Sequence, residues 1–195
     1  MPSMLEPLNI IGEWTDGYVM DKHVLQSEYL GENAFGEPRY NTTRTRLGEL
    51  VYLLKYKWDL GASTEIARLC AEFISDWLKD TKIDIIIAVP PSNKKRDYQP
   101  VFLIGEELSR LTKIPFSPNI LVNTSSTEMK NIPREDRKLL PGSIRKTCPA
   151  KRECNILLID DIISTGTTAN ECVRVLREDE LIRDIYFLAV TKTKN

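Results

Sequence analysis

The sequence has a single histidine, His23, and only four cysteines, none of which forms a CxxC pair. One histidine excludes a metal site built from several histidines, and the cysteine spacing does not match that of a structural zinc site. We therefore expect Cys70, Cys148, Cys154 and Cys172 to be reduced thiols in a cytoplasmic protein. A Cys–His nucleophile pair has no support in the sequence pattern.

The sequence also lacks a large excess of one charge sign and long apolar runs. The chain has 27 Lys and Arg against 28 Asp and Glu, which gives a formal net charge of -1. That balance argues against a protein that coats nucleic acid through bulk charge. No apolar run approaches the roughly 20 residues that cross a bilayer, and residues 1–12 show no secretory signal pattern. The length of 195 residues suits one globular domain with a small appendage.

From residue 47 onward, hydrophobic periodicity predicts helices that alternate with strands. Apolar residues at helical spacing predict helices within 47–58, 66–78, 101–111 and 169–176. Short, mostly β-branched runs predict strands at 83–89, 119–122, 155–159 and 185–190. Because the run at 83–89 does not alternate with polar residues, it is typical of a strand buried on both faces. The expected fold class is therefore α/β, with a mainly parallel sheet flanked by helices.

Residues 1–46 have the weakest periodicity and are interrupted by several glycines, with short strand-like pieces such as 18–20. We interpret them as a strand-and-loop appendage to an α/β core at 47–195. In such a core, ligands bind beyond the carboxyl ends of the parallel strands. Candidate functional residues should therefore follow Val89, Val122 and Ile159.

The segment 156–168 carries the most specific pattern, Ile-Leu-Leu-Ile-Asp-Asp-Ile-Ile-Ser-Thr-Gly-Thr-Thr. It places Asp160 and Asp161 at the end of an apolar strand, before a hydroxylated loop and a helix. Backbone N–H groups and hydroxyls at a helix N-terminus bind anions, and Gly166 permits a close approach of the backbone. Paired carboxylates suit hydroxyl donors or a magnesium ion. Together these features predict a site for a phosphorylated ribose, whereas the alternative is a generic strand–turn–helix with a solvated acid pair.

This segment resembles the 5-phosphoribosyl-1-pyrophosphate (PRPP) binding signature of type I phosphoribosyltransferases. Residues 53–59 and the strand that ends Ala88-Val89-Pro90 are similar to the ComF-like group of that family, and the resemblance spans about residues 47–191. Residues 1–46 depart from it, because ComF-like proteins often begin with a four-cysteine zinc element that is absent here. The sequence also lacks the competing phosphate-binding patterns GxxxxGK[ST] and GxGxxG.

The resemblance implies a type I phosphoribosyltransferase fold in which residues 1–46 act as a hood over the acceptor. It assigns the ribose hydroxyls to Asp160 and Asp161, which would also hold Mg²⁺ indirectly, through ligand or water. It assigns the 5-phosphate to Ser164, Thr165, Gly166, Thr167 and Thr168.

Two further segments receive roles from the same resemblance. The pyrophosphate loop would comprise Pro90, Pro91, Ser92, Asn93, Lys94, Lys95 and Arg96. Its two X-Pro bonds would make a cis peptide cost only about 0.5–1 kcal/mol. The polar stretch 123–154 would be a mobile catalytic lid that carries Lys130 and Arg137. The alternative interpretations are a solvated basic turn and an ordinary flexible loop.

The implied function is transfer of a phosphoribosyl group from PRPP, with Mg²⁺, to a small nitrogenous acceptor, as in nucleotide metabolism. Purine-salvage members carry an aspartate at the position of Ser164, so a purine read through that carboxylate is disfavoured. Asp21, Lys22 and His23 are candidates for acceptor recognition, while Lys55 and Tyr56 match the family pattern without a derived role. The alternatives are a non-catalytic PRPP or nucleotide sensor and an adaptor in competence or DNA processing. Relatives are commonly homodimers, and the sequence gives no evidence for a nucleic-acid or membrane partner.

Overall fold

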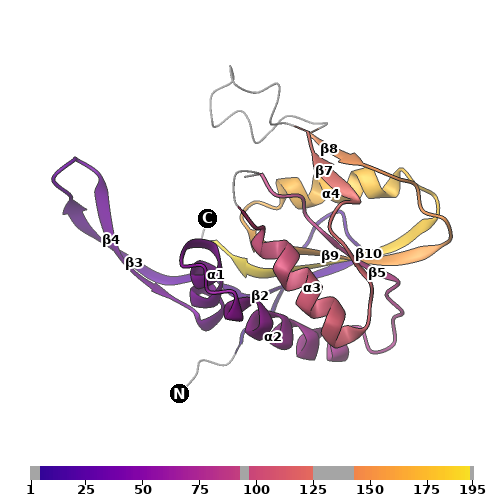
Figure 1. Ribbon diagram of the computed structural model, residues 1–195, viewed down its shortest axis with the longest axis horizontal. Helices are drawn as coiled ribbons and strands as arrows, with labels where there is room; N and C mark the ends of the chain where they lie inside the picture. The colour runs from indigo at the N-terminus through magenta and orange to yellow at the C-terminus, as the bar shows by residue number, and fades with distance from the viewer. Residues whose placement is uncertain (1–4, 93–96, 125–142, 194–195) are drawn as a thin grey trace.

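One six-stranded sheet runs through the body of the computed structural model, which describes residues 5–92, 97–124 and 143–193 (Figure 1). In spatial order its strands are β1 (Leu8–Asn9), β2 (Asp16–Lys22), β10 (Ile182–Lys192), β9 (Cys154–Ile163), β5 (Ile85–Ala88) and β6 (Phe116–Ser117). Every neighbouring pair is parallel except β1 with β2. The expected α/β class with a mainly parallel sheet is therefore confirmed.

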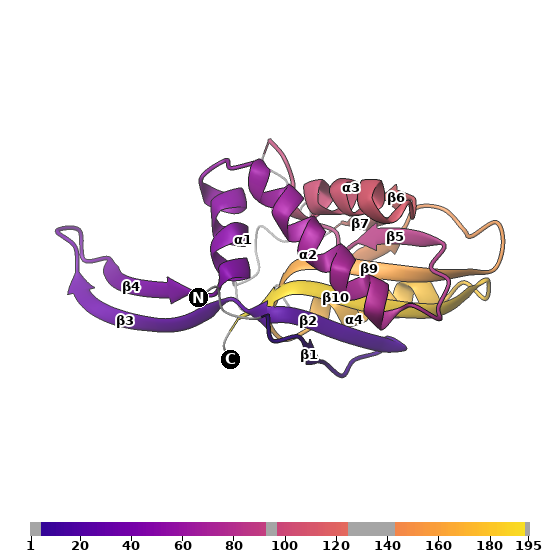
Figure 2. The same cartoon turned by 90° about the horizontal axis from the view of Figure 1, so that it is seen from below.

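Helices cover both faces of this sheet, as Figure 2 shows. They are α1 (Arg46–Tyr56), α2 (Gly61–Trp77), α3 (Pro100–Thr112) and α4 (Thr167–Arg177). Helices α1, α2 and α3 share one core cluster with Leu157 and Ile159 of β9, whereas α4 shares the other cluster with Ile156 and Leu158. Successive residues of a strand face opposite sides, so both faces of β9 are buried, and this explains its unbroken apolar run.

Strand β9 is longer than the sequence predicted. The prediction ended it at Ile159, but pairing with β10 continues to Ile163, which is buried. Asp160 and Asp161 therefore lie within strand β9, and the loop begins only after Ile163. The reason is that β10 extends to Lys192 and stays in register with β9 past the acids, from Ala189 opposite Asp160 to Lys192 opposite Ile163.

The segment predicted as a strand at 119–122 forms β7 (Leu121–Asn123), but outside the central sheet. It pairs antiparallel with β8 (Ile144–Lys146) in a small two-stranded sheet. The carboxyl end of β7 thus does not join the edge where β5 and β9 end. Among the residues that the structure describes, no helix has the length and apolarity needed to cross a membrane.

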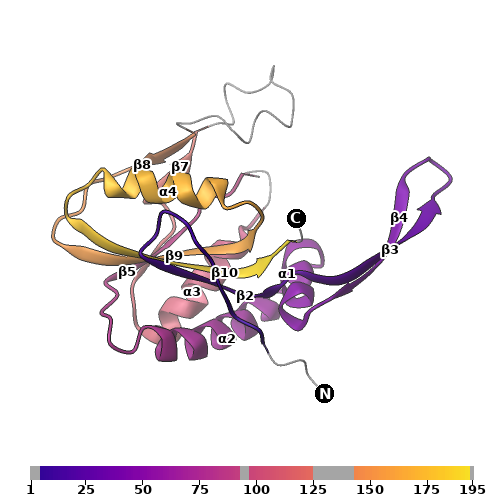
Figure 3. The same ribbon diagram turned by 180° about the vertical axis from the view of Figure 1, so that it is seen from behind.

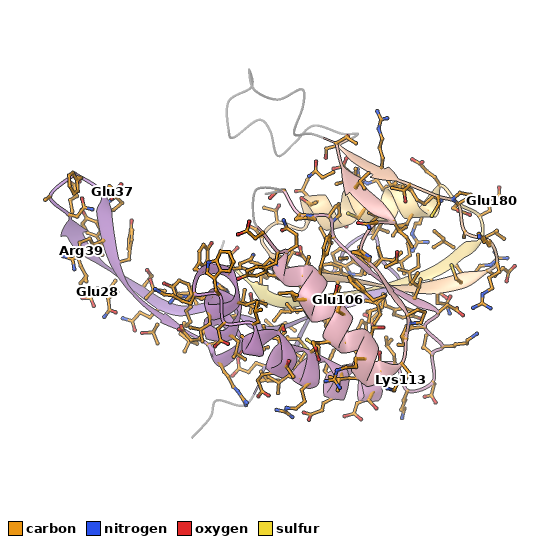
Figure 4. All side chains as sticks on the ribbon, viewed as in Figure 1. Glu28, Glu37, Arg39, Glu106, Lys113 and Glu180 are labelled. Carbon is orange, nitrogen blue, oxygen red and sulfur yellow. The ribbon has the colours of Figure 1, made fainter. Side chains whose placement is uncertain are left out.

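The first 46 residues divide between the sheet and a projecting hairpin. Strand β2 lies within the six-stranded sheet, where Val19 and Met20 are fully buried. The hairpin of β3 (Val24–Glu32) and β4 (Pro38–Arg44) extends away from the body (Figures 1 and 3). Figure 4 places the charged side chains of Glu28, Glu37 and Arg39 along it. The division into a hood at 1–46 and a core at 47–195 stays a prediction, but the central sheet crosses the boundary.

Helix α1 packs closely on the root of this hairpin. Its N-cap, Thr45, accepts a hydrogen bond from the Gly48 N–H at 3.0 Å and donates one to the Lys22 carbonyl at 2.6 Å. A Cβ at Gly48 would lie 2.0 Å from the His23 carbonyl oxygen. Only glycine permits that approach, so position 48 fixes where α1 meets the end of β2.

Candidate functional site

A cavity of about 260 Å³ opens at the carboxyl edge of β5 and β9. Such an edge is where parallel α/β sheets bind ligands. The described residues that line the cavity are Lys55, Val89, Pro90, Pro91, Ser92, Gln99, Pro100, Val101, Asp160, Asp161, Ile162 and Thr168. It therefore brings together parts of three predicted segments, namely the acid pair, the loop that follows it and the segment after Val89.

The acid pair is set into the end of β9. The Asp161 N–H donates to Asp160 Oδ1 at 2.8 Å. Burial raises the pKa of Asp160 well above its usual value, and the charge of Asp161 raises it further. Lys55 and the N–H groups of Asp161 and Ile162 oppose this increase. Asp160 thus holds its proton more tightly than an exposed aspartate, and a bound cation would favour the ionised form.

Lys55 is the cation closest to this pair among the described residues, through a contact that sequence reasoning did not assign. Its Nζ donates to Asp161 Oδ1 at 2.9 Å, and the two side chains are only 15% and 12% exposed. Lys55 lies in the last turn of α1, where the helix dipole also favours a positive charge. The match of Lys55 to the ComF-like pattern was the only signal available in the sequence, because its partner is 106 positions away.

The three acceptor candidates in the N-terminal segment are not among the described residues that line the cavity. His23 Nδ1 lies 3.1 Å from Thr191 Oγ1, and this hydroxyl donates to the Asp161 carbonyl at 3.3 Å. Burial, followed by the nearby cations Arg44 and Lys55, lowers the pKa of His23. Burial also raises the pKa of Asp21, which pairs in register with Thr191, whereas Lys22 is exposed. His23 is therefore connected to the acid pair through Thr191 and not through the described lining of the cavity.

The hydroxylated loop leads from β9 into α4 as the sequence predicted. Gly166 is the N-cap of α4 with a φ of 82°, a left-handed conformation that favours glycine. Its carbonyl accepts from the Asn170 N–H at 2.8 Å, and the hydroxyls of Thr165 and Thr167 are 2.9 Å apart. Thr168 lines the cavity, and Ser164, Thr165, Thr167 and Thr168 are all exposed. The helix N-terminus and its hydroxyls thus lie at the cavity edge, accessible to an anion.

The remaining candidates are only partly described. Pro90, Pro91 and Ser92 line the cavity, and the part of the chain that the structure describes contains no cis peptide bond. The cis form considered at the two X-Pro bonds is thus not found. The cationic residues Lys94, Lys95 and Arg96 lie outside the described residues, and so do Asn93 and the lid residues Lys130 and Arg137.

The donor set of the cavity suits a cation that is shared with a ligand. Over the described ranges, no group of three or more His, Cys, Asp or Glu could by itself hold a metal ion. Two adjacent carboxylates instead suit Mg²⁺, which keeps several waters and is usually bound through one or two carboxylates together with substrate phosphates. Asp160 and Asp161 therefore fit an ion that arrives with a phosphorylated ligand.

No protein-family model matches the chain, and neither does any curated protein. Among solved structures, adenine phosphoribosyltransferase from Leishmania tarentolae is 10% identical, over 96% of this chain and 94% of its own, with a TM-score of 0.46. The Saccharomyces cerevisiae enzyme of the same name, solved with an imino-altritol bisphosphate and adenine, is 15% identical over 85% of each chain, with a TM-score of 0.44. Leishmania donovani UMP synthase is 15% identical over 82% of this chain and 27% of its own, with a TM-score of 0.39. At these values the chemistry of the site has to be argued from its own residues.

Proposed function

We propose that the chain binds PRPP with Mg²⁺ and transfers its phosphoribosyl group to a small nitrogenous acceptor, with release of pyrophosphate. The observation that supports this proposal is the composition of one cavity at the carboxyl edge of a parallel sheet. An acid pair, a hydroxylated helix N-terminus and the segment after Val89 meet there. These groups complement a ribose diol, a phosphate and a diphosphate that lie within one small molecule.

In this proposal each group has a distinct role. Asp160 and Asp161 accept hydrogen bonds from the ribose hydroxyls and hold Mg²⁺ through ligand oxygens or water. The loop at 164–168 binds the 5-phosphate, and residues 90–96 bind the pyrophosphate with the help of their three cations. Lys130 and Arg137 close over the bound substrate as a lid.

The transfer step requires little covalent chemistry from the protein. A lone pair on the acceptor nitrogen forms the new bond to C1 of the ribose, while the C1–O bond breaks and its electrons leave with pyrophosphate. The acceptor nitrogen then loses its proton to solvent. Bound Mg²⁺ would supply charge neutralisation at the leaving diphosphate. The chain's own residues orient the ribose and stabilise the positive charge that develops at C1.

Calorimetric titration with PRPP and Mg²⁺, paired with a pyrophosphate-release assay over a panel of bases, tests the proposal. The double variant Asp160→Asn, Asp161→Asn should lose PRPP binding while it keeps its circular dichroism spectrum. Asp76→Asn, an exposed acid on α2, is the matched control and should bind as the unaltered chain does. Undiminished binding by the double variant would refute the proposed site. Binding without pyrophosphate release from any base would instead favour a non-catalytic sensor.

A further inference from the structure

An aromatic pair, Trp58 and Tyr98, is connected through chain neighbours and one hydrogen bond to residues that line the cavity. Tyr56 ends α1 and is 59% exposed, and Trp58 in the following turn is 62% exposed. The rings of Trp58 and Tyr98 meet edge to face, with centroids 5.2 Å apart. Lys55 and Gln99, the chain neighbours of Tyr56 and Tyr98, both line the cavity. We call Trp58 and Tyr98 the aromatic platform, and the Tyr98 hydroxyl also reaches the carbonyl of Leu54, the chain neighbour of Lys55, whereas the Tyr56 ring contacts Tyr52 instead.

Two contacts hold the platform in place, namely the ring contact between Trp58 and Tyr98 and a hydrogen bond from Tyr98, while Trp58 is exposed and Tyr98 is half-buried. The Tyr98 hydroxyl donates to the Leu54 carbonyl of α1, which ties the segment before α3 to that helix. Figure 2 shows the turn between α1 and α2 beside this segment. Rings that are held by contacts on one side, and left to solvent on the other, can receive a flat ligand without reorganisation.

The backbone of Trp58 is unusual for so large a residue. Helix α1 ends with the N–H groups of Lys57 and Asp59 both donating to the Leu53 carbonyl, at 2.9 and 3.3 Å. This ending places residue 58 in the left-handed region, with a φ of 58°, where glycine is strongly preferred. A bulky residue in that conformation is rare, and such strain collects at functional sites.

We propose, on the basis of the function proposed above, that the aromatic platform binds the acceptor as a planar heteroaromatic base. Base–aromatic stacking tolerates any base, because every base has a flat π face. The acceptor must reach C1 of a ribose that is held in the cavity, and the platform is joined to the cavity lining through Gln99, next to Tyr98, and through Leu54, next to Lys55. Trp58 and Tyr98 would thus determine acceptor affinity. This assignment moves acceptor recognition from residues 21–23, which are not among the described residues that line the cavity, to the turn that follows α1.

Tryptophan fluorescence tests the proposal directly, because the three tryptophans differ in environment. Trp14 is buried and stacked on Phe187, and the Trp77 indole donates to Asp16, so Trp58 is the indole most accessible to an added base. Adenine, guanine, uracil and orotate are added in turn to the chain loaded with PRPP and Mg²⁺. At least one of them should quench the emission and protect it from acrylamide. Trp58→Phe should abolish the change, whereas Trp77→Phe should retain it.

Kinetics of pyrophosphate release provide the second measurement. Trp58→Gly, which suits the left-handed backbone, should raise the acceptor KM at least about tenfold and leave PRPP affinity unchanged. Trp58→Phe keeps a ring and should keep the KM within about threefold. Leu60→Ala is the matched control, because Leu60 is an apolar side chain of the same turn that is 54% exposed. It should leave both constants unchanged.

The outcomes separate this inference from the function on which it rests. Failure of PRPP to bind would refute both. Pyrophosphate release with an unchanged acceptor KM in Trp58→Gly would overturn the platform and leave the transferase intact. PRPP binding with no base able to quench or protect Trp58 would also overturn it. Quenching by a short oligo-dT alone would assign the platform to single-stranded nucleic acid instead, and would equally overturn the proposal.

Discussion

Replacement of Lys55 by methionine is expected to destabilise the fold far more than loss of a surface ion pair. The Lys55–Asp161 contact is 2.9 Å long, and its side chains are only 15% and 12% exposed. Removal of one partner of a buried pair costs about 3–5 kcal/mol, since it leaves an uncompensated charge. Because both groups keep some access to water, we expect a loss of about 2–3 kcal/mol. In a chain of this size each kcal/mol lowers Tm by about 2–4 °C, so Tm should fall by about 4–12 °C.

A double-mutant cycle with Asp161→Asn measures the pair itself. Urea unfolding at pH 7, followed by circular dichroism, gives the free energy of unfolding for each variant. Lys55→Met combined with Asp161→Asn should recover most of the loss, because no buried charge is then left unpaired. Arg68→Met is the control, since Arg68 pairs with Glu65 and Glu72 on the surface of α2 at 46% exposure. Arg68→Met should lower the free energy of unfolding much less than Lys55→Met does, because water and salt screen an exposed ion pair.

The reasoning is refuted if Lys55→Met costs no more than the control, or if the coupling energy is below about 0.5 kcal/mol. Either result would mean that water screens the pair as it screens an exposed one. The acid pair would then lie in a more open site than the structure describes. Asp160 would not experience the desolvation that raises its pKa.

Three other predictions follow from burial and packing. Because burial makes the folded chain bind the Asp160 proton more tightly than the unfolded chain does, its ionisation costs stability as pH rises above about 4. Asp160→Asn should therefore raise Tm more at pH 8 than at pH 4 in the absence of divalent cations, and a constant difference would contradict this. Cys148 is exposed, whereas burial raises the pKa of Cys70 to about 12, so a thiol reagent at pH 8 should label Cys148 quickly and Cys70 only in denaturant. Equally fast labelling would disprove that burial. Gly48→Ala should cost about 2–3 kcal/mol in urea unfolding because its Cβ would meet the hairpin root at 2.0 Å, whereas Gly61→Ala, with its nearest neighbour atom at 3.2 Å, should cost less than about 1 kcal/mol.

The apolar pattern of the sequence is enough to predict the helices and strands whose own residues are buried at a regular period. The apolar stripes of α1 to α4 and the unbroken runs of β5 and β9 follow from burial on a known period. The sequence predicts only residues 18–20 of strand β2, because Asp, Gly and Lys interrupt the apolar pattern of this strand. One cause is Gly17, where a Cβ would lie 2.4 Å from the Trp14 indole nitrogen. A glycine required by a neighbouring ring weakens the strand pattern without weakening the strand.

In the candidate site too, the sequence predicts the residues that are contiguous and misses those that the fold brings together. The acid pair and the loop at 164–168 are contiguous, so their order in the sequence reproduces their order in space. Lys55 and Thr191 contact Asp161 from elements that are distant in the chain, and no spacing rule connects them. Trp58 was also hidden, because its significance lies in a left-handed backbone and in a ring contact with Tyr98.

The position of β10 in the sheet has a consequence for how the chain is made. Residues 182–192 separate β2 from β9 and pair with both, so the last of the described strands along the chain fills the middle of the sheet. During translation, β2 has no parallel neighbour among the described strands until residues 182–192 have left the ribosome. Formation of the sheet is therefore a late, long-range event, which predicts slow folding. A ribosome stalled before residue 182 would expose the apolar edges of β2 and β9, and such nascent chains should depend on chaperones.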